Sequence, residues 1–146
     1  MIVEERLVTY LHSLEQENSE ILKEIEQEAL RDSVPIIRKE MQSFLKVLLA
    51  IHRPLRVLEV GTAVGFSALL FCEYGPENMQ VTTIEKYEKR IPIARENFRR
   101  AGRENQITLL EGDAADILKE LQKPYDLIFM DIMMPVMNGY DATKKI

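Results

Sequence analysis

Several features that mark special classes of protein are scarce or missing in this sequence. Cys72 is the sole cysteine, which excludes an internal disulfide and a cysteine-based metal cluster. It follows three apolar residues on a predicted helix, so a buried structural thiol is favoured over a nucleophile. No apolar run approaches the roughly 18 residues of a membrane-spanning helix. No charged and then apolar leader opens the chain, and a cytoplasmic location is therefore expected.

An excess of positive charge is also missing. The chain has 19 Lys and Arg against 24 Asp and Glu, which gives a formal net charge of −5. This balance does not attract nucleic acid, and the short apolar runs give no reason to expect a membrane partner. The composition, 46% hydrophobic and 29% charged, is that of an ordinary globular protein.

The chain of 146 residues is long enough for one domain with a core and too short for two ordinary ones. Its first part, residues 1–52, is helical in pattern. Apolar residues recur three and four apart from Val3 to Leu14 and from Asn18 to Arg31. A third helix is predicted next, with Pro35 in its first turn and Ser33 as its cap.

The third helix has an apolar stripe that is wide enough to lie on a sheet. The stripe consists of Ile37, Met41, Phe44, Leu45 and Leu48. Core packing is the favoured interpretation for each of these residues, Met41 included.

Strands and helices alternate from residue 53 onward. Apolar strands that alternate with helices predict a parallel sheet covered on both faces, so the fold class is α/β, a Rossmann-like parallel sheet of about four strands. The predicted strands are Leu55–Val60, Gln80–Ile84, Ile107–Leu110 and Asp126–Met130, and the predicted helices are Phe66–Tyr74, Tyr87–Ala101 and Ala114–Leu121.

The stretch "VLEVGTAVGFSALLF" contains the first candidate site. A strand runs into Glu59, Gly61 lies in the following turn and Gly65 opens a helix. Glycines at these points let the backbone approach a ligand, and the helix start offers free N–H groups. The spacing G-x-x-x-G differs from the G-x-G-x-x-G of dinucleotide sites, so an adenosine ligand without a pyrophosphate fits better.

Two more acids follow the next strands. Glu85 ends the second strand in "VTTIEKY", where an acid is placed to accept hydrogen bonds from both hydroxyls of a ribose. Asp113 follows the third strand in "LLEGDAAD", where it is placed to meet an adenine amino group. A solvated strand-end acid is the alternative for Glu85, and ordinary turn chemistry is the alternative for Asp113.

These motifs together carry a family resemblance. The segments "RVLEVGTAVGFSAL", "TTIEKYEKRIPIARENFRRAG" and "LLEGDAADIL" resemble successive motifs of the class I S-adenosylmethionine-dependent O-methyltransferases of the catechol type. The likeness covers residues from about 33 to 131 and is strongest to the bacterial branch that includes tRNA hydroxyuridine methyltransferases. It implies S-adenosylmethionine as cofactor and a sheet with strand order 3-2-1-4.

The resemblance also implies roles for single residues. It assigns Glu59, Gly61 and Gly65 to the methionine end of the cofactor and Ser67 to its carboxylate. It assigns Glu85 to the ribose, and it implies that Met41 borders the same pocket as an alternative to core packing. The pair Asp113 and Ala114 goes to the adenine.

Asp131 has two implied roles. In the catechol-type family an aspartate at the end of the fourth strand is a ligand of a divalent cation, and an Asp-Asn pair after the fifth strand supplies further ligands. No fifth strand is predicted here, so one carboxylate is left, and Mg²⁺ is not expected to be held. Asp131 remains a candidate catalytic residue and metal ligand, while catalysis is not expected from this chain.

The segment "YDLIFMDIMMPVMNGYDATKKI", residues 125–146, resembles a different family. It is similar to the third strand, loop and helix of a response-regulator receiver domain, which has a flavodoxin-like fold. There the aspartate that matches Asp131 is the phospho-acceptor. Receiver chemistry also needs an acid pair after the first strand and a Thr or Ser and a Lys from later strands, which this sequence does not supply.

Two resemblances that meet at Asp131 lead to a hypothesis about the origin of the chain. We interpret the chain as an engineered chimera that joins the first half of a methyltransferase to a receiver fragment. A natural truncated gene is the alternative. Within one domain, residues 1–52 are the helical segment, 53–131 the methyltransferase-like half and 132–146 the receiver-like loop and helix.

Three functions stay open on this basis. The favoured one is a scaffold that retains binding of S-adenosylmethionine or S-adenosylhomocysteine without catalysis. The alternative is an active O-methyltransferase with a hydroxyl acceptor, tRNA among the candidates, and a weaker alternative is a phospho-acceptor module. The outer strand 126–130 has no predicted partner on one side, so a homodimer is expected, through this edge or by exchange of elements.

Overall fold

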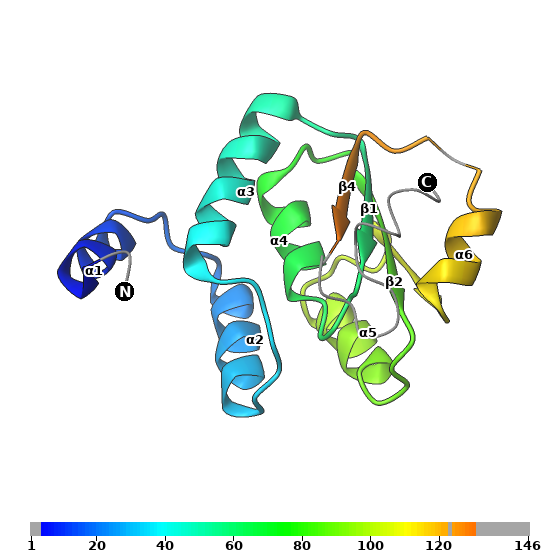
Figure 1. The fold of residues 1–146 in the computed structure, drawn as a ribbon, viewed down its shortest axis with the longest axis horizontal. Coiled ribbons are helices and arrows are strands. Elements are labelled where there is room, and N and C mark those ends of the chain that lie inside the picture. The colour runs from blue at the N-terminus through cyan, green and yellow to red at the C-terminus, as the bar shows by residue number, and fades with distance from the viewer. Residues whose placement is uncertain (1–3, 123, 131–146) are drawn as a thin grey trace.

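Strands and helices alternate from β1 onward in the computed structural model, which describes residues 4–122 and 124–130 (Figure 1). Asp131 and the segment 132–146, which carry the metal, phospho-acceptor and receiver predictions, lie outside the described residues. No helix in the described part of the chain is long and apolar enough to cross a membrane. The elements are α1 (Glu5–Ser13), α2 (Glu20–Arg31), α3 (Lys39–His52), β1 (Arg56–Val60), α4 (Phe66–Tyr74), β2 (Gln80–Glu85), α5 (Ile91–Arg100), β3 (Ile107–Glu111), α6 (Ala114–Glu120) and β4 (Leu127–Met130).

The four strands form one sheet with the order β3-β2-β1-β4, and every pairing is parallel. This confirms the predicted α/β class and the strand order 3-2-1-4. In the register of the sheet, Glu59 of β1 lies between Thr83 of β2 and Phe129 of β4. Because parallel strands end at the same edge, the loops after β1, β2 and β3 all meet there.

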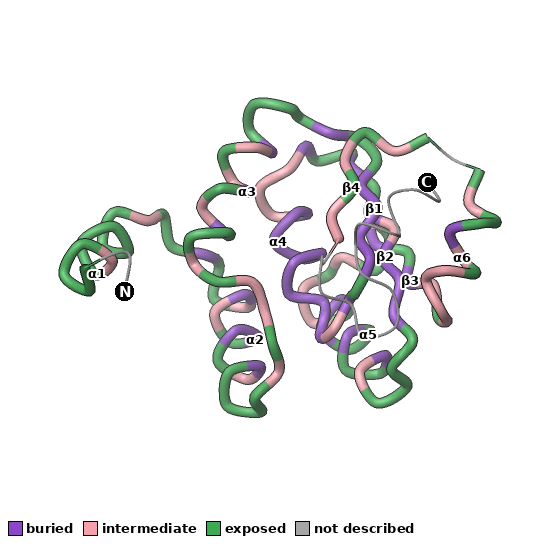
Figure 2. The backbone as a smooth tube through the Cα atoms, in the orientation of Figure 1, coloured by how far each residue is buried: buried purple, intermediate pink, exposed green. Residues whose placement is uncertain are grey.

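Helix α4 lies between the sheet and the N-terminal helices. Every residue from Phe66 to Cys72 is buried (Figure 2). A helix that is apolar on all sides needs neighbours on all sides, and here the sheet covers one side while α2 and α3 cover the other. Burial raises the pKa of the Cys72 thiol to about 12, so this residue is the structural thiol that was predicted.

The opposite face of the sheet has a smaller apolar cluster. Leu118 of α6 packs there with Leu58 and Val60 of β1 and with Ile84 of β2. The two clusters give the sheet a covered face on each side, as near-continuous apolar strands require.

Asp126 joins three elements at the opposite end of the sheet from the loops. Its Oδ2 accepts hydrogen bonds of 2.9 Å from the backbone N–H groups of Leu55 and Arg56. Its carbonyl oxygen lies 2.8 Å from Nε2 of His52, at the end of α3. The backbone hydrogen bonds hold the pKa of the Asp126 carboxyl below its usual range. The start of β4 is thereby fixed against the start of β1.

The predicted start of the third helix is wrong. Ser33 has a φ of 54° and ends α2, because its N–H donates to Leu30 and the next N–H, of Val34, donates to Ala29. This pair of bonds is the Schellman arrangement that closes a helix with a left-handed residue. Pro35 lies in the non-helical segment that follows, and α3 begins only at Lys39.

The core packing predicted for the whole stripe of α3 is also wrong. Leu45 and Leu49 are buried, whereas Met41 and Phe44 are 42% and 59% exposed. The reason is that α3 packs on α4, not on the sheet, and a helix in this outer layer buries a single narrow face. The exposed residues form what we call the outer stripe of α3: Met41, Phe44, Val47 and Ile51.

Candidate functional site

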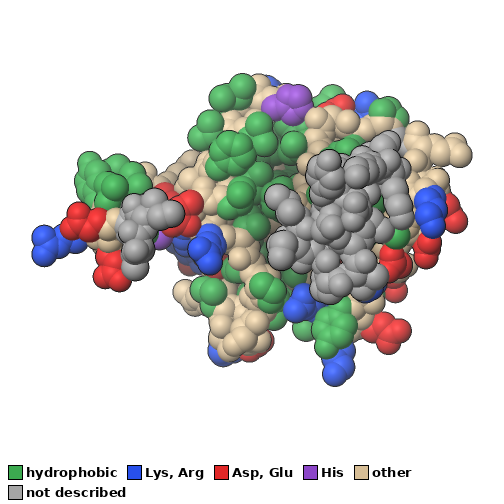
Figure 3. All heavy atoms as spheres, in the orientation of Figure 1, with side chains coloured by type: hydrophobic (Ala, Val, Ile, Leu, Met, Phe, Trp, Pro, Cys, Tyr) green, Lys and Arg blue, Asp and Glu red, His purple; other side chains and the backbone are tan. Residues whose placement is uncertain are grey.

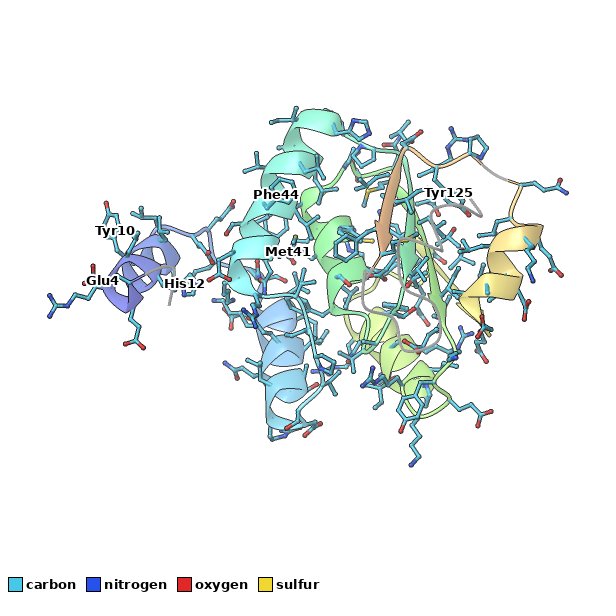
Figure 4. All side chains as sticks on the ribbon, viewed as in Figure 1. Glu4, Tyr10, His12, Met41, Phe44 and Tyr125 are labelled. Carbon is cyan, nitrogen blue, oxygen red and sulfur yellow. The ribbon has the colours of Figure 1, made fainter. Side chains whose placement is uncertain are left out.

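A large open cavity lies at the carboxyl edge of the sheet. Its volume is about 1710 Å³, more than the roughly 300–1,000 Å³ of a typical pocket for one small ligand. The loops after β1, β2 and β3 line one end, and α1 and α3 line the other. Met41 is among the lining residues, as its alternative assignment predicted, and Figure 4 shows it on α3.

The loop after β1 turns tightly beside the end of β2. The N–H groups of Gly61 and Thr62 both donate to the carbonyl of Ile84, at 3.0 and 3.1 Å. Gly61 has a φ of 99°, and a Cβ placed on it would meet no atom of residues 4–122 and 124–130 within 4 Å. The backbone at Gly61 is therefore open toward the cavity, which is what close approach of a ligand needs.

Gly65 has a different reason to be glycine. A Cβ at this position would overlap the ring of Phe98 on α5, and Gly65 is not among the residues that line the cavity. Its φ of 86° also favours glycine. Gly65 thus packs the start of α4 against α5. No side chain of the described residues caps α4 at Gly65, so among them the first N–H groups of the helix stay available to an acceptor.

Glu85 is buried at the cavity wall, and backbone N–H groups fix its carboxylate. Oε2 accepts from Ala63 at 2.8 Å, and Oε1 accepts from Lys86 at 3.0 Å and from Tyr87 at 2.9 Å. A carboxylate has about four acceptor positions, so one position remains on Oε2 for a ligand hydroxyl. The bonds to the following residues also delay the next helix, and α5 begins at Ile91, not at the predicted Tyr87.

Asp113 caps the helix that follows β3. Its Oδ1 accepts from the N–H of Ala115 at 2.8 Å, and its Oδ2 lies 3.3 Å from Nζ of Lys86. These two interactions hold the pKa of the Asp113 carboxyl below its usual range. Asp113 and Ala114 both line the cavity. The capping geometry agrees with the turn-chemistry alternative, and the adenine contact stays a prediction.

Glu59 lies beneath the site and does not line the cavity. Its side chain is 0% exposed, and its carboxyl group accepts hydrogen bonds from the hydroxyls of Ser67 and Thr83. Burial raises the pKa of Glu59 to about 7, against the opposing effect of the two hydroxyls. Ser67 lines the cavity, so Glu59 reaches the site through it.

Two threonines belong to the same site and were missed in the sequence. Thr62 lines the cavity, and its Oγ1 lies 2.6 Å from Oγ1 of Thr83. Thr83 looks like an ordinary strand residue in "VTTIE", and only the pairing of β1 with β2 places it beside Glu59. A polar residue on the buried face of a central strand is the signal that could have found it.

Metal ligation receives no support from the described residues, among which no group of three His, Cys, Asp or Glu could hold an ion. The predicted ligand Asp131 lies outside them, so its roles as metal ligand, catalytic residue and phospho-acceptor stay predictions. The residues that are brought together at the cavity are Gly61, Thr62, Ser67, Glu85, Asp113 and Ala114.

A glycine turn, a fixed strand-end carboxylate and an uncapped helix start at one edge of a parallel sheet define a Rossmann-like ligand-binding domain. The chain matches the O-methyltransferase family over residues 12–138, and it belongs to that family. The match continues past Asp131 into the segment for which a receiver origin was predicted.

Relatives with names or structures agree with the family. A catechol O-methyltransferase of Niastella koreensis is 33% identical over 101 residues, which cover 66% of this chain and 46% of that enzyme. A methyltransferase from Geobacter sulfurreducens has a TM-score of 0.85 at 26% identity, over 99% of this chain and 75% of that one. An O-methyltransferase from Bacillus cereus, in complex with S-adenosylhomocysteine, has a TM-score of 0.75 at 27% identity, over 84% of this chain and 59% of that one. The chain spans about half the length of the curated relatives that it matches.

Proposed function

We propose that this chain is the cofactor-binding part of an S-adenosylmethionine-dependent O-methyltransferase and that it binds S-adenosylmethionine and S-adenosylhomocysteine. The observation that carries the proposal is the carboxylate of Glu85, which three backbone N–H groups fix beside the open backbone of Gly61. Membership of the O-methyltransferase family and the likeness to a structure that holds S-adenosylhomocysteine support it.

The residues at the cavity suit the two ends of such a cofactor. The adenosine end would lie between Glu85, which keeps one acceptor position for a ribose hydroxyl, and the Asp113–Ala114 turn. The methionine end would lie at Gly61 and Ser67, where the uncapped start of α4 favours a carboxylate. These contacts account for one end of the cavity.

The other end of the cavity leaves room for a methyl acceptor. When bound, the cofactor supplies a methyl group on a positively charged sulfur for transfer to a hydroxyl oxygen. Met41 and Val47 of α3 and Leu11 of α1 line this end, and their apolar side chains would keep water from the methyl group. The acceptor is therefore proposed to be a hydroxyl compound with an apolar body.

Calorimetric titration with S-adenosylhomocysteine tests the proposal. Glu85→Ala removes a charge-assisted contact of about 1.5–3 kcal/mol, so we expect a loss of affinity of about 10- to 150-fold. Glu111→Ala is the matched control, because Glu111 also ends a strand but pairs with Arg95 outside the cavity. An unmodified chain that gives no binding heat would exclude the proposal.

The chimera remains a second candidate that concerns the segment 132–146. Its resemblance to a receiver domain motivates a phospho-acceptor role for Asp131, whereas the family match that runs to residue 138 favours the methyltransferase origin. Incubation with a small phosphodonor and Mg²⁺, followed by intact mass measurement, separates the two. A mass unchanged by the phosphodonor would rule out Asp131 as an acceptor.

We also propose that the chain forms a homodimer in which α1 of each copy covers Phe44 and Ile51 of the other, the two residues of the outer stripe of α3 that do not line the cavity. No residue of α1 is buried, and Figure 3 shows hydrophobic side chains gathered on α1 and over α3. Reciprocal docking would bury both surfaces around one two-fold axis. An antiparallel arrangement would also place the acidic start of α1, Glu4 and Glu5, near Arg53 at the end of α3.

Light scattering tests the dimer against a monomer. We expect Phe44→Glu to halve the mass, because a buried charge in the interface is destabilising. Ile93→Glu on α5 is the control, since Ile93 is 47% exposed and lies away from the outer stripe. A monomer across the micromolar range, or a dimer that survives Phe44→Glu, would refute the arrangement. Within the described residues β4 pairs with β1 alone, so its outer edge is the other route to a dimer.

A further inference from the structure

A continuous chain of hydrogen bonds runs beneath the floor of the cavity. Thr62 Oγ1 lies 2.6 Å from Thr83 Oγ1, Thr83 Oγ1 donates to Glu59 Oε2 at 2.6 Å, and Ser67 donates to Glu59 Oε1. The two ends of this chain, Thr62 and Ser67, line the cavity, whereas the middle pair is hidden below it. Two surface groups of the site are therefore connected through a buried carboxyl group.

The number of protons in this chain of hydrogen bonds decides whether Ser67 donates or accepts a hydrogen bond toward a ligand. A hydroxyl group has one proton to donate, and an ionised carboxylate can only accept. When Glu59 is ionised, both Ser67 and Thr83 must point their protons at it. Ser67 then presents only lone pairs to the cavity, and these repel the carboxylate of a ligand.

A protonated Glu59 reverses the polarity at Ser67. The carboxylic acid can donate its own proton to the oxygen of Ser67, because a carboxylic acid has one O–H donor. The Ser67 proton is then free to point into the cavity. There it lies beside the uncapped N–H groups at the start of α4, which attract the same negative charge.

We infer that Glu59 is a positioning residue that sets the hydrogen-bond polarity of Ser67, so that an α-carboxylate binds at Ser67 together with uptake of one proton by Glu59. The inference rests on the proposed function, since it needs an amino-acid ligand at this end of the cavity. Thr83 supports Glu59 in this role because it occupies the second oxygen in both states.

The surroundings of Glu59 place the proton uptake in an accessible range. Burial raises the pKa of Glu59 to about 7, and the charge of Glu85 on β2 adds to the increase. The other titratable group nearby is Cys72 of α4, whose own raised pKa keeps the thiol neutral. The strand partners of Glu59, Thr83 and Phe129, are uncharged. Near neutral pH, a ligand that binds better to one protonation state of Glu59 can therefore shift the protonation equilibrium of Glu59 toward that state.

Calorimetry in two buffers of different ionisation enthalpy measures this proton uptake directly. The probes are S-adenosylhomocysteine and 5′-methylthioadenosine, which keeps the adenosine and thioether but lacks the α-carboxylate and amino group. We expect uptake of close to one proton with S-adenosylhomocysteine at about pH 8 and none with 5′-methylthioadenosine. Between about pH 7.5 and 8.5 the affinity for S-adenosylhomocysteine should fall about tenfold per pH unit.

Glu59→Gln is the matched variant, because a neutral amide donates at all pH values. We expect it to bind S-adenosylhomocysteine with no proton uptake and with an affinity that changes little with pH. Circular dichroism and thermal denaturation establish its fold, and the two-ligand comparison in the unmodified chain does not depend on it.

The outcomes separate the two proposals. Binding of S-adenosylhomocysteine without proton uptake, or uptake that persists in Glu59→Gln, would overturn the role of Glu59 and leave the proposed function intact. Absence of binding by both probes would remove the proposed function, and the role of Glu59 with it.

Discussion

The carboxylate of Glu85 accepts a 2.8 Å hydrogen bond from the backbone N–H of Ala63 and so couples the end of β2 to the loop after β1. This bond holds Ala63 at a φ of 50°, in the left-handed region where a Cβ is unfavourable. Contacts within the protein therefore fix the shape of the loop, and the loop carries local strain at Ala63.

Ala63→Gly should relieve this strain. We expect the free energy of unfolding to rise by up to about 1 kcal/mol, because glycine adopts a positive φ without the steric penalty, although it gains entropy when unfolded. Urea denaturation gives the difference. Ala68→Gly is the variant for comparison. It lies within the buried part of α4, where glycine should be destabilising. A loss of stability in Ala63→Gly would show that the loop is not strained.

Gly65→Ala should destabilise the protein by more than backbone strain alone explains. The added Cβ would overlap the Phe98 ring, and overpacking of this kind costs about 1–3 kcal/mol. Gly102→Ala is the control for strain, because Gly102 has a φ of 65° and no neighbour within 4 Å of an added Cβ. The double variant Gly65→Ala with Phe98→Leu should recover part of the loss. Equal effects of the two glycine substitutions would argue against the overlap.

The stability of the protein without ligand should also report on Glu59. Its pKa is raised from an ordinary value of 4.5 to about 7, so the stability that it confers is complete below about 4.5 and declines as the pH rises toward 7. Glu59→Gln does not ionise. The difference in free energy of unfolding between Glu59→Gln and the unmodified chain should therefore move in favour of the variant by roughly 3 kcal/mol between low pH and pH values above 7. Urea denaturation at several pH values measures this, and parallel stability curves would contradict it.

Asp126→Asn should weaken the attachment of β4 to β1. The carboxylate accepts from the N–H groups of Leu55 and Arg56, and its pKa is lowered from the ordinary 3.8. Its contribution to stability is therefore present above pH 3.8 and is lost as the pH falls through the lowered value. We therefore expect Asp126→Asn to lower the urea midpoint below that of the unmodified chain at pH 6. The difference between the two midpoints should be smaller at acidic pH. Asp116→Asn on α6, where Lys119 is the one side-chain partner in the described part of the chain, should change the midpoint little.

The sheet and the main residues of the site could be predicted because their signals are local. Gly61 and Glu85 follow short apolar strands, and the alternation of strand and helix is enough to bring such loops to one edge. The strand order followed from family resemblance. The start of α4 at Phe66 was predicted for the same local reason.

What could not be predicted depends on contacts between distant segments. Ser33 suits the start of one helix as well as the end of another, and only the hydrogen bond from Val34 to Ala29 decides between them. The apolar stripe of α3 does not reveal that another helix, not the sheet, will be its support, so the exposure of Met41 was missed. Thr83 becomes part of the site only through pairing across strands.

The burial of α4 from Phe66 to Cys72 has a consequence for how the chain can be divided. Seven successive buried residues on α4 cannot remain in water once their outer cover is removed, so α2 and α3 must be in place whenever α4 is folded. A fragment that starts at residue 53 would contain all four described strands and still expose a row of large apolar side chains. Such a fragment should aggregate during expression, because the N-terminal helices that cover α4 in the whole chain are missing from it.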